Sequence, residues 1–159
     1  MDSRAKQVAV GLARLGWQVV PCYGIVRADS GDGDEWGVED GGPAIPGHCS
    51  CHKGKDCVSP GKHPIGRGWE NIASADAAAV GEWDCWKSHP DMNVGVRWGG
   101  ASGVIDVEYD CDAGRETIER LGLADAETPT FRSSRSVHRI FAWEDGLPDT
   151  AVLKAAGLE

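Results

Sequence analysis

The stretch GVIDVEYD, residues 103–110, is the part of the sequence that indicates the fold most clearly. Apolar and acidic residues alternate along it, which is the period-two pattern of a β-strand that turns one face toward a core. Asp106 and Glu108 therefore fall on the same face of the strand. Two carboxylates at that spacing repel each other unless a cation lies between them, so the pair is a candidate site for Mg²⁺ or Mn²⁺. The alternative is a solvated strand face that carries two acids.

A second stretch, TPTFRSSRSVHRIF at residues 128–141, predicts a β-hairpin. Two strand-like runs, 130–133 and 137–143, flank a turn at 134–136. Basic and hydroxyl donors gather on this turn and the strands beside it: Arg132, Ser134, Arg135 and His138. Next to an acidic strand, such donors form a candidate cradle for a triphosphate, with His138 donating to a phosphate oxygen. The alternative for His138 is a half-buried strand residue without a chemical role.

A cysteine cluster precedes both stretches, with the spacing Cys49-x-Cys51-x5-Cys57-x5-His63. Three thiolates and one imidazole make the closed tetrahedral set of a structural zinc site. His48 and His52 are competing nitrogen donors. The alternative is a group of reduced cysteines on a polar loop. A loop of this composition has little apolar surface to order it, so we expect one tightly held Zn²⁺.

The remaining segments supply helices, strands and one long loop. The pattern predicts helices over 3–15, 74–88 and 113–121, strands over 17–23, 93–98 and 103–109, and an acidic, glycine-rich loop over 28–47. This order predicts an α+β or mixed α/β domain, in which helices flank an antiparallel or mixed sheet.

The composition is that of a soluble protein, with 41% hydrophobic residues in 159 and no apolar run long enough for a membrane span. The first 16 residues lack the apolar region of a signal peptide, so we interpret the protein as cytoplasmic, without a membrane partner. The net charge of −9 argues against broad capture of nucleic acid by a basic surface. A local basic groove and metal ions remain compatible with a nucleic-acid enzyme.

Taken together, these segments resemble the N-terminal bifunctional DNA primase–polymerase domain of plasmid, phage and prophage replication proteins, which is related to archaeal–eukaryotic primases. The similar segments follow one another in the order GWQVVPC (16–22), GKHP (61–64), GW (68–69), EWDCW (82–86), HPDMNVGV (89–96), SGVIDVE (102–108) and TPTFRSSRSVHRIF (128–141). Some members of that family also carry a cysteine-rich insert before the GKHP segment.

The resemblance implies a role for each matching residue. Asp106 and Glu108 correspond to the acidic metal ligands, and His138 corresponds to the histidine that contacts the phosphates of the incoming nucleotide. Ser134 and Arg135 fall on the loop before that histidine, and Arg132 is a further phosphate contact. The resemblance also implies that Lys62 lies near the nucleotide or the template, although a solvated loop lysine is an equal alternative. It implies that Asn93 and Gly95 line the same nucleotide cleft; the alternative is that they form a turn into a strand.

The resemblance further implies one primase–polymerase domain over residues 1–159, with the acidic loop 28–47 and a zinc loop 48–64 as parts of it. Expected partners are a DNA template and primer, nucleoside triphosphates, and a helicase in the same or a neighbouring chain. The chain departs from the family pattern at Ser136 and Val137, where family members usually have glycines. The family's third acid lies on a strand beyond Glu159, so we expect the domain to be incomplete at its C-terminus. The alternatives are a catalytically inactive module that binds nucleic acid or a replisome, and a metal-dependent nuclease or phosphohydrolase.

Overall fold

The computed structural model describes residues 3–26, 47–109, 111–133 and 136–147, so the predicted acidic loop 28–47 lies almost wholly outside the described residues. The chain divides into two compact units, Met1–Arg97 and Trp98–Glu159. Helices and small antiparallel sheets make up both units, which confirms the predicted mixed fold. The single domain over residues 1–159 stays a prediction.

Helix α1 (Arg4–Arg14) opens the first unit and begins as predicted at Ser3, whose Oγ accepts a hydrogen bond from the N–H of Lys6 at 3.2 Å. The helix ends before Gly16, which has a φ of 85° that suits glycine. Ala9 and Ala13 are buried, whereas Val8 and Leu15 are exposed. Small side chains on the buried face let α1 approach its neighbours closely.

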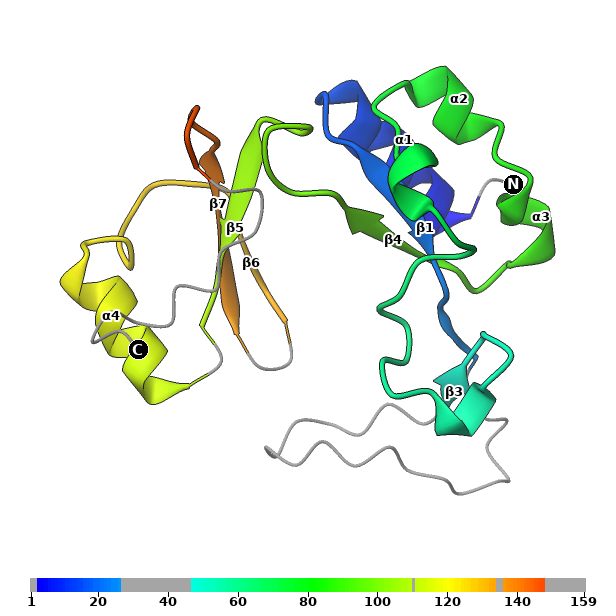
Figure 1. Ribbon diagram of the computed structural model, residues 1–159, viewed down its shortest axis with the longest axis horizontal. Helices are drawn as coiled ribbons and strands as arrows, with labels where there is room; N and C mark the ends of the chain where they lie inside the picture. Colours follow the sequence, from blue (N-terminus) through cyan, green and yellow to red (C-terminus); the bar gives the residue numbers. More distant parts are fainter. Residues whose placement is uncertain (1–2, 27–46, 110, 134–135, 148–159) are drawn as a thin grey trace. The chain divides into compact units, whose positions relative to one another are not determined.

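The core of the first unit forms where α1 meets strand β1 (Val19–Cys22) and helix α2 (Ala77–Gly81), as Figure 1 shows. Every residue of β1 is buried, in agreement with the buried strand that the sequence predicts. Strand β1 pairs antiparallel with β4 (Asn93–Val96), and Val19 lies opposite Val96. Val19 and Val80 are both fully buried in this core.

The predicted helix over 74–88 is wrong in one respect, because the structure has two short helices there, α2 and α3 (Cys85–Ser88). Asp76 rather than Ser74 caps α2, and its Oδ1 accepts hydrogen bonds from the N–H groups of Ala78 and Ala79 at 2.9 and 3.2 Å. Gly81 ends α2, since glycine loses more conformational freedom in a helix than other residues do. As predicted, the second helix stops before Pro90.

The cysteine segment is attached to β1 through a small sheet of β2 (Ile25–Val26) and β3 (His48–Cys49), followed by the 3-10 turns η1 (Gly54–Asp56) and η2 (Trp69–Asn71). Ser50 and Gly24 join the two strands at one end of this sheet. The Oγ of Ser50 accepts from the N–H of Gly24 at 2.9 Å, and the N–H of Ser50 donates to the Gly24 carbonyl at 3.0 Å.

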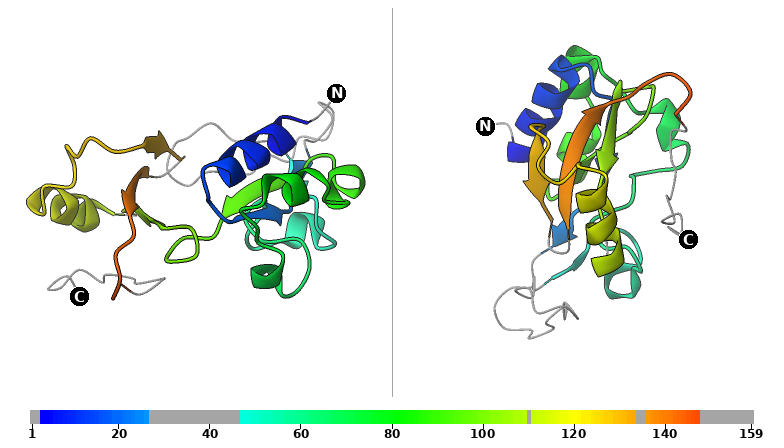
Figure 2. Two further views of the ribbon diagram at one scale, coloured as in Figure 1. Left: turned by 90° about the horizontal axis from the view of Figure 1, so that it is seen from above. Right: turned by 90° about the vertical axis from the view of Figure 1, so that its left-hand side faces the viewer.

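The second unit is a three-stranded antiparallel sheet in the order β5 (Val104–Val107), β7 (Val137–Ala142), β6 (Thr130–Arg132), with helix α4 (Asp112–Arg120) (Figure 2). The predicted hairpin is confirmed, since β6 and β7 pair with Phe131 opposite His138. Arg139 anchors the segment after α4 to β7, because its Nε and Nη2 donate to the Ala124 carbonyl at 3.1 and 2.8 Å. β4 and β5, which follow each other in sequence, belong to different sheets.

Candidate active site

Asp106, Glu108 and His138, which we call the acid–histidine cluster, lie together on the second unit. Asp106 is on β5 and His138 on the adjacent β7, where Asp106 pairs with Ile140. The Nδ1 of His138 lies 2.7 Å from Oδ2 of Asp106, and its Nε2 lies 3.2 Å from Oε2 of Glu108. One donor atom from each of the three residues can be chosen so that all lie within 4.8 Å of one another. The strand register thus brings together the two acids and the histidine that the sequence singled out separately.

Burial differs across the cluster. The side chains of Asp106 and His138 are only 10% and 12% exposed, whereas that of Glu108 is 45% exposed. The Oδ1 of Asp106 is buried and has no hydrogen-bond partner among the described residues. A buried carboxylate oxygen normally has a partner, and a divalent cation is one that two carboxylates and an imidazole can share. The residues present therefore fit a divalent metal site.

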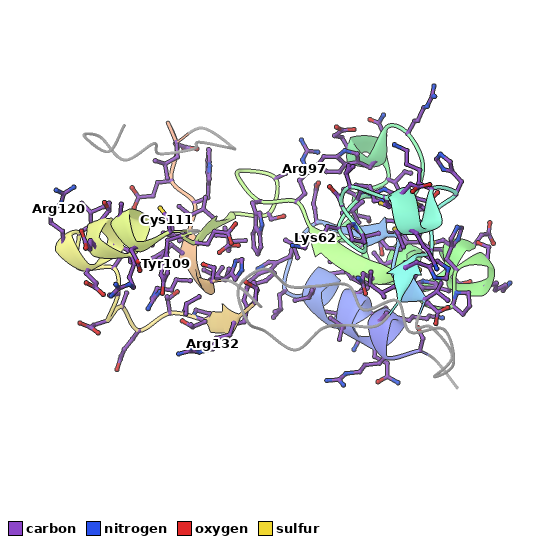
Figure 3. The ribbon with its side chains drawn as sticks, turned by 90° about the horizontal axis from the view of Figure 1, so that it is seen from below. Lys62, Arg97, Tyr109, Cys111, Arg120 and Arg132 are labelled. Carbon is purple, nitrogen blue, oxygen red and sulfur yellow. The ribbon has the colours of Figure 1, made fainter. Side chains whose placement is uncertain are left out.

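Ser136 ties the hairpin turn to the end of β5. Its Oγ accepts a hydrogen bond from the N–H of Tyr109, the residue after Glu108, at 3.1 Å. The turn is closed by Ser133, whose Oγ accepts from the Ser136 N–H at 3.0 Å and whose N–H donates to the Ser136 carbonyl at 3.0 Å. Figure 3 labels Tyr109 where the chain leaves β5. The predicted phosphate contacts Ser134 and Arg135 lie outside the described residues.

Phe131 belongs beside the cluster, although the sequence reasoning did not select it. Its ring is stacked on the His138 imidazole, with 4.3 Å between centroids and 4° between planes. Phe131 is nevertheless 47% exposed. The hairpin register, which could have been deduced from the sequence, puts Phe131 opposite His138. Successive side chains of a strand point to opposite faces, so Arg132 (labelled in Figure 3) lies on the other face of β6 from Phe131. The structure therefore does not bring Arg132 to the cluster.

The four predicted zinc ligands also come together, in the first unit. The Nε2 of His63 lies 3.5 Å from Sγ of Cys49 and 3.3 Å from Sγ of Cys57, and Cys51 completes the group. In tetrahedral zinc sites, bond lengths of about 2.3 Å to sulfur and about 2.0 Å to nitrogen place these donors about 3.5 Å apart. All three cysteines are buried. The cluster could hold zinc, with His63 as its nitrogen donor.

The surroundings of the sulfurs shift the thiol pKa values of Cys49 and Cys57 in opposite directions. Burial raises the pKa of the Cys49 thiol, but hydrogen bonds with the backbone at Gly61 and Cys51 and with the Cys51 and Cys57 side chains together bring this pKa below its ordinary value. Burial raises the pKa of Cys57 above its ordinary value. Tyr23 packs against the fourth candidate ligand, His63, with 4.8 Å between the two ring centroids. These contacts hold the ligands in a preformed arrangement.

The other predicted cleft residues have structural contacts within the first unit. The Nδ2 of Asn93 donates to the Gly61 carbonyl at 2.9 Å. A Cβ on Gly95 would lie 3.1 Å from Sγ of Cys22, so glycine at this position favours close packing of β4 on β1. Lys62 is exposed beside the cysteine segment (Figure 3). Their predicted roles at a nucleotide or template remain untested.

No helix in the described part of the chain has the length and apolar character needed to cross a bilayer. The family model of the bifunctional DNA primase/polymerase N-terminal domain matches residues 9–158, which include most of both units. This family has a primase or polymerase type of function in DNA replication, and its domain implies binding of DNA and nucleotides. Searches of curated proteins and of solved structures found no match. The chain belongs to the bifunctional DNA primase/polymerase N-terminal family.

Proposed function

We propose that this chain carries the acidic ligands and the phosphate-contacting histidine of a DNA-directed nucleotidyltransferase, which makes and extends primers on a DNA template. The observation that supports the proposal best is the acid–histidine cluster, in which three candidate donor atoms lie within 4.8 Å. The family match supports the general class of reaction. The cluster adds a specific place on the second unit where that reaction would occur.

In this proposal Asp106 and Glu108 hold Mg²⁺ or Mn²⁺. Bound divalent cations neutralise the charge of a triphosphate and favour in-line displacement at phosphorus. The primer 3′-hydroxyl loses its proton to solvent as its oxygen attacks the α-phosphorus of the nucleotide, the bond from that phosphorus to the bridging oxygen breaks, and pyrophosphate leaves. The half-exposed Glu108 faces solvent, from which a triphosphate would arrive, whereas Asp106 is held more deeply.

His138 orients the triphosphate by donating a hydrogen bond to a phosphate oxygen, together with donors from Ser134 and Arg135 on the loop before it. Its two contacts with carboxylates and its stacking on Phe131 fix the plane of the imidazole. Because each ring nitrogen of His138 already contacts a carboxylate, Nε2 would exchange the longer contact with Glu108 for the phosphate oxygen while Nδ1 keeps Asp106. Arg132 remains a candidate phosphate contact that would have to reach around the edge strand β6.

Primer extension tests the proposal. The 159-residue chain, and any longer protein that contains it, would be incubated with a primed DNA template, labelled deoxynucleotides and Mn²⁺. We expect incorporation that disappears in the double variant Asp106→Ala with Glu108→Ala. The control is Glu116→Ala with Asp125→Ala, which removes the same charge from exposed positions on the same unit. Incorporation that survives in the first variant would exclude the acid pair as metal ligands.

The same reagents distinguish the alternative functions. Degradation of labelled DNA in the absence of nucleotides, lost in the Asp106→Ala, Glu108→Ala variant, would indicate a nuclease that uses the same acids. Retained DNA binding with neither incorporation nor degradation would indicate an inactive primase-like module. Calorimetric titration with Mn²⁺ gives a second readout, because the double variant should lose Mn²⁺ binding while the control keeps it.

A further inference from the structure

A hollow of about 410 Å³ lies in the first unit, and its described lining residues include none of the acid–histidine cluster or of the cysteine cluster. The first turn of α1 contributes Lys6 to its wall, and the segment from the end of α2 through α3 contributes Trp83, Trp86 and Lys87. Pockets of about 300–1,000 Å³ accommodate ligands of the size of a nucleotide. We call this hollow the tryptophan pocket.

Two indole rings form a rigid wall of the tryptophan pocket. Trp83 and Trp86 lie with their ring centroids 5.8 Å apart and their planes 23° apart. Both rings are partly exposed, and both pack against the core of the first unit. The Nε1–H of Trp86 donates to the Val80 carbonyl at 2.7 Å, which satisfies its polar group and fixes its orientation. The surface that the rings leave to the pocket is therefore a preformed aromatic one.

The tryptophan pocket has more basic than acidic residues among its described lining, whereas the chain as a whole is acidic. The chain as a whole has 25 acidic and 16 basic residues. Among the described residues that line the pocket, in contrast, Lys6 and Lys87 are basic and Glu82 is acidic. Lys87 is exposed and follows Trp86 directly. An ammonium group beside an aromatic wall can contact a phosphate while a flat ring stacks on the indole.

We infer that the tryptophan pocket binds a base of single-stranded DNA, stacked on the indole wall, with Lys87 near the adjacent phosphate. The inference rests on the proposed function, since it assigns to the first unit a contact with the strand on which the second unit acts. A single strand fits better than a duplex, because only unpaired bases have open faces to stack on a side chain. Stacking does not depend on base identity, as a template contact requires.

Oligonucleotide binding by this chain tests the phosphate contact. Fluorescence anisotropy with labelled oligothymidylate, without metal or nucleotide, would be measured at several salt concentrations. For Lys87→Glu we expect weaker binding and a slope of log K against log salt that is shallower by about 0.7 to 1. The matched control is Arg120→Glu, the same charge change at an exposed position at the end of α4 (Figure 3). Equal binding by the two variants would overturn the inference.

The stacking contact is tested separately. Trp83→Leu should bind the oligonucleotide roughly 5- to 150-fold more weakly, the range expected for the loss of one stacked base. An oligonucleotide of abasic sites, which keeps the phosphates, should bind the wild type and Trp83→Leu equally. Ultraviolet crosslinking of a bromodeoxyuridine oligonucleotide to the wild type needs no variant to fold, and we expect adducts at Trp83 or Trp86. Adducts found only elsewhere would overturn the inference.

The outcome is distinguishable from failure of the proposed function. The Asp106→Ala, Glu108→Ala variant should keep full oligothymidylate binding, because the tryptophan pocket belongs to the other unit. Loss of incorporation with retained binding supports both proposals. Binding that is unaffected by Lys87→Glu and Trp83→Leu, together with incorporation that depends on the acids, would overturn the tryptophan pocket alone.

Discussion

The imidazole of His138 lies flat against the ring of Phe131, with 4.3 Å between their centroids and 4° between their planes. The two residues face each other across β6 and β7. Because the carboxylates of Asp106 and Glu108 approach the imidazole through its two nitrogens, the phenyl ring is the contact that covers its face. Under the proposed function, Phe131 therefore acts on the cluster through His138, as a positioning residue.

Replacing Phe131 by alanine should loosen the imidazole. The lost stacking of about 0.5–1.5 kcal/mol corresponds to a rise of roughly 2- to 13-fold in the nucleotide KM of primer extension, with a smaller change in kcat. Phe131→Tyr keeps an aromatic ring and serves as the control, with a KM near that of the wild type. Indistinguishable KM values for the alanine and tyrosine variants would contradict a positioning role.

The cysteine cluster predicts one zinc per chain. Elemental analysis of protein purified without added zinc should give a ratio near one, and Cys57→Ala should abolish it. The loss of several kcal/mol of folding energy should lower the Tm by roughly 10 °C. Cys111→Ala, at an exposed cysteine outside the cluster, is the control and should keep both zinc and Tm. If the wild type freed of zinc has the same Tm as the wild type purified without chelator, the metal is not structural.

Gly24 and Gly11 form a matched pair for backbone packing. A Cβ on Gly24 would lie 1.5 Å from the Asp91 carbonyl oxygen, whereas a Cβ on Gly11 would have no atom within 4 Å. Gly24→Ala should therefore lower the free energy of unfolding by about 3 kcal/mol or more, because backbone must move. Gly11→Ala, in the middle of α1, should raise it by about 0.5–1 kcal/mol. Urea titrations of both variants check the two signs.

The buried thiol of Cys22 makes stability depend on alkaline pH. Burial raises its pKa from 9.0 to about 11, although a backbone hydrogen bond at Gly95 opposes the shift. The unfolded chain loses this proton at lower pH than the folded chain does. The contribution to stability is therefore complete below pH 9 and is lost as the pH rises to about 11. Urea titrations between pH 8 and 11 should show a smaller decline in the free energy of unfolding for Cys22→Ala than for the wild type. Equal declines would contradict a contribution of the Cys22 thiol.

Much of the fold could be predicted because local patterns determine it. The N-cap at Ser3, the buried β1 and the β6–β7 hairpin all follow from signals within a few residues. Tertiary packing decided the rest. The buried face of α1 is set by small residues at its contacts, and the helix predicted over 74–88 is interrupted after Gly81.

The site was predictable in its residue types but not in its contacts. Alternation puts Asp106 and Glu108 on one face, and donor chemistry selects His138 and the Cys49–His63 group. That His138 contacts both carboxylates depends on the register of β5 with β7, two strands separated by α4. No local pattern fixes such a register. Phe131 lies in the hairpin, whose register is local, and was overlooked because the sequence reasoning selected donor side chains and a phenyl ring has none.

At position 136 this chain has a serine where members of the family usually have a glycine, and the serine hydroxyl makes a contact that a glycine lacks. Since Ser136 is buried and its Oγ accepts from the N–H that follows Glu108, the loop before His138 and the end of the acidic strand share one anchor. A displacement of the loop by a triphosphate would pull on the backbone that carries Glu108. Under the proposed function, nucleotide occupancy would thus be coupled to the position of Glu108 through the Ser136 hydroxyl, a link that a glycine at this position could not make.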